Sequence, residues 1–531
     1  MPTPTASTSS GGTPSRLRRR GAALLAGATG LALAVTGCTT GNSADGGAEG
    51  KTDTIRSTMI ANPNSFNPLT SSGVPATMAN SLLYATLLVQ DDNHTFAGDL
   101  ASEWELSPTR GEFTLREGAT CADGTQITAS VVKASLDAFA RKSNNKDLVF
   151  GPSEPKISAD DAAGKVTIEL DTAWADMGQG LSMPESGIIC PAGLKDPEGT
   201  TAGKVEGAFS GPYTLADYQP GVNVEFALRD EGYTWPEYAQ PFEGRVAKTI
   251  KYSVSSDYNS IANGLLTNQI DIATVLGEPM ERFKDDEKFG TERFSTANLF
   301  MVFNERKGKP FADSEARRAV AKAVDQKAFV QAATNGLGAP ATSFVSESVQ
   351  CANTDAALLS PKDADLADIK GQAATLVGTP AVGKGAGNTY IAQALNEAGA
   401  DVKLRSVDTA SLFTELSTKP DSWDMTVVNL VNISSTLYAG LSRFTGPTTE
   451  DGGRNITGAK HEKFLAQVGQ AMAETDEDKR CAIYQDLQAG LFQDAHVVPL
   501  GDVSAQLTTA QGFSARVING ISSARTMRIT D

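Results

Sequence analysis

Histidine is scarce in this chain of 531 residues, which contains only His94, His461 and His496. No two of them are close in sequence, so there is no H-E-x-x-H zinc-protease motif, and the G-x-S-x-G nucleophile elbow is also missing. We therefore predict no catalytic residues and no enzymatic activity. Because a triad can be assembled from residues far apart in sequence, an extracellular hydrolase stays an alternative.

Cysteine is nearly as scarce, and its spacing argues against a metal site. No two of the five cysteines have the C-x-x-C spacing typical of zinc ligands, so we predict neither a metal nor a cofactor. Cys38 belongs to the export signal described next. The other four, Cys121, Cys190, Cys351 and Cys481, are an even number, which in an exported protein predicts two disulfides with three pairings open.

Long apolar runs are also missing. Gly21–Val35 has 15 residues, against roughly 20 for a transmembrane helix. It follows four arginines and precedes any acidic residue, as in a secretory signal, and the general and twin-arginine export routes both stay open. Val35–Cys38 resembles the lipobox of bacterial lipoproteins. This resemblance implies that residues 1–37 are a signal peptide and that Cys38 is lipidated.

Positive charge is in deficit. The chain has 46 Lys and Arg against 63 Asp and Glu, and loss of residues 1–37 removes four arginines, which changes the formal charge from −17 to −21. Such a polyanion has no electrostatic reason to bind nucleic acid or anionic lipid head groups. Lipid on Cys38 would therefore hold the protein at the membrane, and residues 38–53, which are rich in glycine and small or polar residues, would be a flexible tether.

One segment looks like a phosphate-binding loop. Gly378–Lys384 lies between a predicted strand at Ala373–Val377 and a predicted helix at Asn388–Ala398, as such loops do. The next residue is Gly385, so the hydroxyl that would hold magnesium is missing. We interpret the segment as a Gly-rich connection in a βαβ unit that ends in a strand at Asp401–Leu404, which predicts an α/β fold class.

Short motifs occur in a recognisable order along the chain. The most distinctive block is Phe113–Gly118, Asp123–Thr125 and Thr128–Val131. Further segments are Ser65–Pro68, Leu100–Glu105, Gly211–Tyr213, Pro310–Asp313, Arg317–Ala319 and Val498–Leu500. In their order, these segments resemble the extracytoplasmic solute-binding proteins of family 5, which serve peptide- and nickel-type ABC importers.

The resemblance implies a two-lobed α/β fold of the periplasmic-binding-protein type II kind (a Venus flytrap), with an extra subdomain on the first lobe. We expect residues 54–91, 207–297 and 499–531 to form the first lobe, residues 92–206 the extra subdomain, and residues 298–498 the second lobe. In this layout the pairs Cys121–Cys190 and Cys351–Cys481 each stay within one lobe, and we favour that pairing.

The resemblance also implies a ligand buried between lobes that close around it. Its contacts are expected in the turn after the first strand, in the strand before Asn304, after Ile270–Ile272, and after Trp423 and Asp424. In this sequence the candidates are Asn62, Asn64, Phe300, Val302, Val275, Leu276, Asn429, Leu430, Val431 and Asn432.

The last of these segments departs from the peptide binders of the family. Those commonly have a Gly-Trp pair and a nearby Asp that binds the peptide's α-amino group, whereas Asn429–Ile433 contains neither Trp nor an acid. Because an unpaired ammonium is costly to bury, either an acid arrives from elsewhere or the ligand has no free amine at this point. Asn429 and Asn432 could instead exchange hydrogen bonds with a neutral or backbone-like ligand.

We therefore expect a monomeric, lipid-anchored receptor on the extracytoplasmic face of a bacterial membrane, in the periplasmic space or at the cell surface. It would bind a peptide or peptide-like solute and deliver it to an ABC permease with its ATPase. A ligand sensor or adaptor on the same fold is one alternative. A receptor for a nickel chelate is another, which the scarcity of histidine disfavours.

Overall fold

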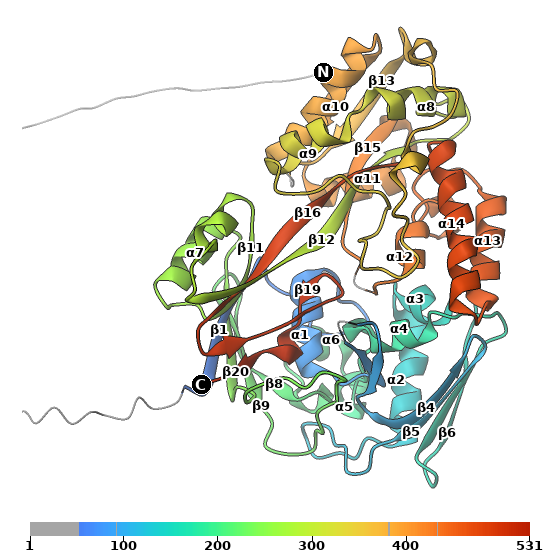
Figure 1. Cartoon of the computed structure of the whole chain (residues 1–531). Coiled ribbons are helices and arrows are strands. Elements are labelled where there is room, and N and C mark those ends of the chain that lie inside the picture. Colours follow the sequence, from blue (N-terminus) through green and yellow to red (C-terminus); the bar gives the residue numbers. More distant parts are fainter. Residues whose placement is uncertain (1–51, 92, 381–382, 433) are drawn as a thin grey trace, which may run out of the picture. The chain divides into compact units, whose positions relative to one another are not determined.

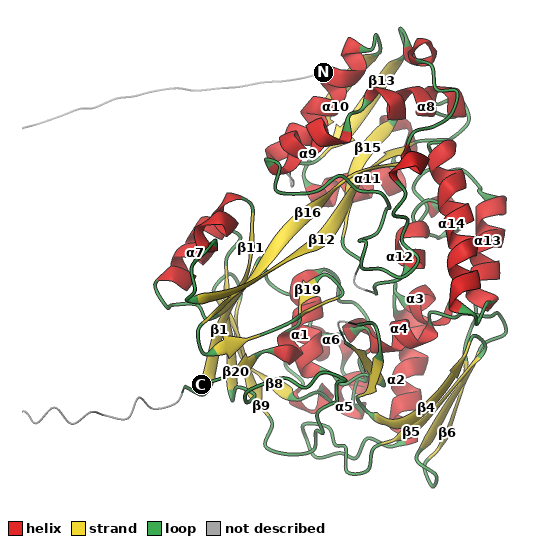
Figure 2. Ribbon diagram, in the orientation of Figure 1, coloured by secondary structure: helices red, strands yellow, loops and turns green. Residues whose placement is uncertain are grey.

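The computed structural model describes residues 52–531 except residues 92, 381, 382 and 433. Cys38, the expected signal peptide and almost all of the expected tether lie outside the described residues. Strands and helices alternate along the described chain, as expected for an α/β protein (Figure 2). Within this part of the chain, no helix combines the length and the apolar character that a membrane crossing requires.

The largest described sheet has six strands in the order β11-β16-β12-β15-β13-β14. Its strands are β11 (Ile272–Leu276), β12 (Phe289–Phe303), β13 (Ala373–Gly378), β14 (Asp401–Ser406), β15 (Met425–Leu430) and β16 (Val497–Ala510). The long strands β12 and β16 pair antiparallel along their lengths (Figure 1). Strand β11 pairs with one end of this long ladder, and β15 pairs with its other end. The strands β12 and β16 therefore connect β11 with the part of the sheet that contains β13, β14 and β15.

The ladder between β12 and β16 is irregular at two places. Its register shifts between Ser295 and Ala297 and again between Leu299 and Phe300, where Pro499 lies opposite. A bulge bends its strand, and proline cannot donate a ladder hydrogen bond. The expected lobe boundaries, 297/298 and 498/499, fall inside these two strands beside the irregularities, and they stay a prediction.

Two four-stranded sheets lie in the expected first lobe and its subdomain. The first has the order β1-β10-β9-β8, and the second has the order β4-β5-β7-β6. Their strands are β1 (Thr54–Met59), β4 (Ala101–Ser107), β5 (Arg110–Leu115), β6 (Lys156–Asp160), β7 (Lys165–Glu169), β8 (Tyr213–Gln219), β9 (Asn223–Leu228) and β10 (Thr249–Val254). The helices and short strands beside them are α1 (Val74–Leu83), α2 (Ala129–Lys142), α3 (Lys146–Phe150), α4 (Met177–Ser182), α5 (Pro191–Lys195), α6 (Pro197–Thr201), α7 (Tyr258–Leu266), β2 (Leu88–Gln90), β3 (Phe96–Gly98), β17 (Phe513–Ser514), β18 (Val517–Ile518), β19 (Ile521–Ser522) and β20 (Arg528–Ile529).

The predicted βαβ unit is confirmed. Strand β13 pairs parallel with β14, and the helix α10 (Ala386–Glu397) connects them. The other helices of the expected second lobe are α8 (Ser314–Ala323), α9 (Gln326–Thr334), α11 (Thr409–Thr418), α12 (Leu437–Leu441), α13 (Glu462–Ala473) and α14 (Glu477–Gln493). Side chains of β12, α8, α9, α10 and β13 share one apolar core, which explains why the apolar residues of these segments recur at helical and strand spacing.

Both favoured disulfides are present. Cys121 bonds to Cys190, and Cys351 bonds to Cys481. The first joins the segment after β5 to the start of α5, and the second joins an irregular segment to α14. Cross-links over 69 and 130 residues restrict the unfolded chain and so stabilise the folded one.

Candidate functional site

A cavity of about 590 Å³ lies where the carboxyl ends of several strands meet. One wall comes from the ends of β1 and β11 and the start of α1. The opposite wall comes from the end of α9, the loop after β13 and the end of β15. The irregular middle parts of β12 and β16 lie between these walls. Open α/β sheets commonly bind ligands outside the carboxyl ends of their strands, so the position is typical of a ligand site.

The lining of this larger cavity is mostly apolar or neutral. Its apolar members include Ile60, Val74, Met78, Leu276, Phe294 and Ile521. Lys384 has the only formal charge among the lining residues, all of which belong to the described chain. It comes from the Gly-rich connection after β13, which thus contributes to the cavity wall although it lacks the hydroxyl of a phosphate-binding loop.

A smaller cavity of about 230 Å³ adjoins the larger one, because Val74 and Val431 line both. Its walls come from residues 72–74, from α3, from the second half of β12 with the end of β15, and from α12 with the segments on either side of it. Three charged side chains line it: Glu185, Arg443 and Arg454. The smaller cavity is therefore the polar end of the site and the larger one its apolar end.

Five of the ten expected ligand residues line these cavities. Leu276 lines the larger one, Leu430 and Asn432 line the smaller one, and Val431 lines both. Asn429 lines the larger cavity, and its side-chain amide has no hydrogen bond to a described residue. The amide of Asn432 is already used within its own loop, because Nδ2 donates to the carbonyl of residue 436 at 2.8 Å. Of the two asparagines expected to bind the ligand, only Asn429 has its amide free for that purpose in the described structure.

Three other expected ligand residues are in the core. Phe300, Val302 and Val275 are completely buried and line neither cavity. Side chains alternate between the faces of a strand, so Val275 faces away from the larger cavity that Thr274 and Leu276 line. On β12 Asn298 lines the smaller cavity, whereas Phe300 and Val302 lie farther along the same face, inside the apolar core.

The two expected residues of the first turn lie outside the cavities as well. Asn62 and Asn64 are exposed, and their side chains stabilise loops: Asn62 Oδ1 accepts from the backbone N–H of Gly221 at 2.7 Å, and Asn64 bonds with Ser72. The cavity is lined instead by the last part of β1 and by Ile60. The strand end, and not the turn after it, reaches the site.

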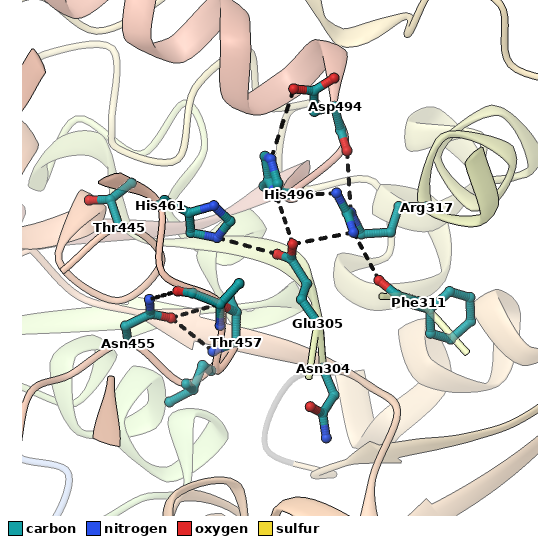
Figure 3. Close-up of polar contacts among 12 residues, drawn as sticks. Asn304, Glu305, Phe311, Arg317, Thr445, Asn455, Thr457, His461, Asp494 and His496 are labelled. Carbon is teal, nitrogen blue, oxygen red and sulfur yellow. Dashed lines mark hydrogen bonds and ion pairs between the residues drawn. The ribbon is translucent and has the colours of Figure 1, made fainter. Parts of the chain in front are cut away.

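Outside both cavities, a polar cluster has the residue types of a metal site. The Glu305 cluster consists of Glu305, which follows β12, and of His461, His496 and Arg317 (Figure 3). The carboxylate and the two imidazoles offer ligand atoms within 4.8 Å of one another. Two of the three histidines thus meet at one buried carboxylate, although 35 residues separate them in sequence, and no spacing motif indicated this.

Arg317 neutralises this carboxylate. Its Nη1 lies 3.2 Å from Glu305 Oε2 and also donates to two backbone carbonyls at 2.9 Å. His496 Nδ1 donates to the same Oε2 at 2.8 Å, while His461 Nε2 lies 3.6 Å from Oε1, a longer electrostatic contact. A divalent cation bound here would lie beside a guanidinium and be repelled by it.

The pKa values fit a structural ion pair. Burial would raise the pKa of Glu305, but the two imidazoles and the charge of Arg317 outweigh burial and hold this pKa at about 2. Burial lowers the pKa of His496, so its imidazole is neutral near neutral pH. We interpret the Glu305 cluster as a charge-balanced structural interaction that holds together the end of β12, α8 and the start of β16.

The comparisons with known proteins agree on one family. The family model of the bacterial extracellular solute-binding proteins, family 5, matches residues 95–452. Protein XP55 of Streptomyces lividans is 27% identical over 326 residues, 60% of this chain and 56% of that protein. The probable D,D-dipeptide-binding periplasmic protein DdpA of Escherichia coli strain K12 is 27% identical over 249 residues, 45% of this chain and 46% of that protein. The chain spans about half the length of these curated relatives.

A solved structure matches over a greater length. A substrate-binding protein from Microbacterium hydrocarbonoxydans, complexed with 4-hydroxybenzoate hydrazide, is 38% identical with a TM-score of 0.79. The match covers 90% of this chain and 100% of that chain. The predicted two-lobed α/β fold of the type II periplasmic-binding-protein kind is thereby confirmed.

Proposed function

This chain belongs to the bacterial extracellular solute-binding proteins of family 5, and we propose that it is the lipid-anchored receptor of an ABC importer. It captures a small solute between its lobes and presents it to the permease without chemical turnover. The observation that carries this proposal is the 590 Å³ cavity between opposing strand ends, a volume that suits a small organic solute.

The proposed ligand is a peptide or a peptide-like solute. Asn429 offers an amide that can both donate and accept a hydrogen bond, which suits an amide-containing ligand. DdpA is described as a probable D,D-dipeptide-binding protein, and the Microbacterium protein holds an acyl hydrazide. Neither histidine nor cysteine lines the larger or the smaller cavity of the described chain, so no observation favours the alternative of a nickel chelate.

The test of solute capture is native mass spectrometry of the protein purified from its own host, followed by removal of any bound molecule. We expect an added mass of a few hundred daltons, consistent with the cavity volume, and a higher melting temperature when the isolated molecule is returned. A protein that arrives empty, and that no fraction of the host's small molecules stabilises, would contradict the proposal.

Import is separated from sensing by uptake measurements. Deletion of the gene should abolish uptake of the solute that the purified protein binds. Unchanged uptake of every bound solute would favour the sensor or adaptor, the alternative on the same fold.

Anchoring is tested at Cys38. The variant Cys38→Ser should lose labelling by palmitate and appear in the soluble extracytoplasmic fraction, because the chain without residues 1–37, with a formal charge of −21, has no electrostatic attraction to anionic lipid head groups. Retention of the unlabelled variant in the membrane fraction would contradict the lipid anchor.

A further inference from the structure

Arg443 is the cation of the smaller cavity whose charge no neighbour balances. It is half-buried, it follows α12, and it lines the cavity. Its guanidinium has no hydrogen bond or ion pair to any described residue. Burial, together with repulsion from Arg454, lowers the pKa of Arg443 to about 10, while Asp147 acts in the opposite direction. At neutral pH the group stays charged and lacks an anion.

The neighbouring arginine already has a carboxylate partner. Arg454 Nη2 donates to Asp147 Oδ1 at 2.9 Å, to Asn145 Oδ1 at 3.4 Å and to the backbone carbonyl of Asn144. The one carboxylate near the two guanidinium groups is thus taken by Arg454. Two cations and one anion leave a net positive charge, and it resides on Arg443.

Glu185 does not supply the missing anion. It lines the same cavity, yet it forms no ion pair with either arginine, and its carboxyl accepts a hydrogen bond from Thr77 Oγ1. Burial raises the pKa of Glu185, which favours the neutral acid. Its second oxygen, Oε2, is fully buried and so does not face the cavity.

A neutral donor lies at the same end. The side-chain amide of Asn298 lines the smaller cavity and makes no hydrogen bond to a described residue. Beyond it the site opens into the larger cavity, where no acidic residue of the described chain is present and apolar side chains dominate. The site therefore combines a cationic end with an apolar chamber.

We propose that Arg443 binds a carboxylate of the solute, and that the solute is an amphiphilic acid that brings no ammonium group to this site. The proposal rests on the proposed function and narrows its ligand class. The planar guanidinium can hold a carboxylate through two parallel hydrogen bonds, and Asn298 Nδ2 can add a third. The body of the solute extends toward Val431 and the apolar chamber. An ammonium would meet no available carboxylate in either described cavity.

The test uses the mature full-length protein and a panel in which every acid has a neutral partner. The panel contains 4-hydroxybenzoate with 4-hydroxybenzamide, N-acetyl dipeptides with their C-terminal amides, and free dipeptides, which add an ammonium. Binding is measured by calorimetry and by thermal shift. We expect at least one acid to bind ten- to a hundredfold more tightly than its amide, as a charged hydrogen-bonded pair allows.

Two variants identify the residue responsible. Arg443→Gln should weaken binding of that acid ten- to a hundredfold and leave binding of the amides unchanged. It should not lower the melting temperature of the unliganded protein, whereas loss of an arginine with a purely structural role would lower it. Arg443→Lys should recover part of the affinity, since it restores charge without the planar fork.

Several results would overturn the inference. The inference fails if amides bind as tightly as the matching acids. It also fails if the Arg443→Gln variant binds the acid with normal affinity. Free dipeptides that bind best, with binding lost in Glu185→Gln, would show that the ligand has an ammonium. If neither the panel nor the host's own small molecules bind, the proposed function fails as well, so the two failures are distinguishable.

Discussion

Two buried groups of charge in this protein differ in how completely they are paired. In the Glu305 cluster every ionised group has an opposite charge within 3.2 Å, and no ligand cavity adjoins it among those described. In the smaller cavity Arg443 is half-buried without an anion. Both regions combine arginine with carboxylates, yet only one is complete without a ligand.

The difference shows why residue type alone is a poor guide to function. Glutamate with two histidines looks like a metal site in composition, but Arg317 supplies its charge balance from within the chain. An unpaired guanidinium beside a cavity has no motif, but it leaves a free-energy cost that a ligand can remove. Charge balance, and not residue type, separates a structural from a ligand-binding cluster here.

The largest expected effect is a loss of stability when the Glu305 cluster is disrupted. Arg317→Met leaves a buried carboxylate without its cation, and we expect a loss of about 3–5 kcal/mol in the free energy of unfolding, measured by chemical denaturation. The matched control is Arg443→Met, where the same change removes an unpaired cation and should cost nothing. Equal losses in both variants would mean that the two regions do not differ as described.

A second prediction concerns acid. The pKa of Glu305 is about 2 in the folded protein, below its ordinary value of 4.5. The stability that this group contributes is therefore present above pH 4.5 and is lost as the pH falls from 4.5 toward 2, by roughly 3 kcal/mol. In Glu305→Gln this part of the pH dependence should disappear. If the free energy of unfolding of the variant and that of the parent change with pH in the same way, the low pKa of Glu305 is contradicted.

Much of the fold was predictable because it is recorded in local patterns. Strand alternation, helical spacing and the order of the motifs indicated the α/β class, the βαβ unit at residues 373–406 and the relationship that the family model confirms. The disulfide pairing was favoured because each pair would stay within one expected lobe, and both disulfides are present. The end of β15 was expected at the site, and Leu430 and Val431 do line a cavity there.

The details of the site were less predictable for physical reasons. Residues 297–303 of β12 are buried on both faces, so this apolar run gave no signal that Asn298, and not Phe300, reaches the cavity. Arg443 adjoins a five-residue helix, and whether its charge is paired depends on Asp147, which lies far away in sequence and is paired with Arg454. Pairing of this kind is a property of tertiary structure, and no sequence period encodes it.

The smallest expected effect sharpens the comparison with a third buried charge. Asp176 precedes α4 and is buried beside Thr436, Tyr484 and Arg480, with one oxygen lacking a partner. Burial raises the pKa of Asp176 to about 6, against an ordinary value of 3.8, although Arg480 and a hydrogen bond from Thr436 act in the opposite direction.

The ionised form of Asp176 therefore costs stability above pH 6, and that cost is relieved as the pH falls from 6 toward 3.8. Asp176→Asn should raise the free energy of unfolding by up to roughly 3 kcal/mol at pH 8 and by much less at pH 4. A variant that is less stable than the parent at pH 8 would show that the attraction of Arg480 outweighs burial, and that Asp176 resembles the paired carboxylate of Glu305 more than the unpaired charge of Arg443.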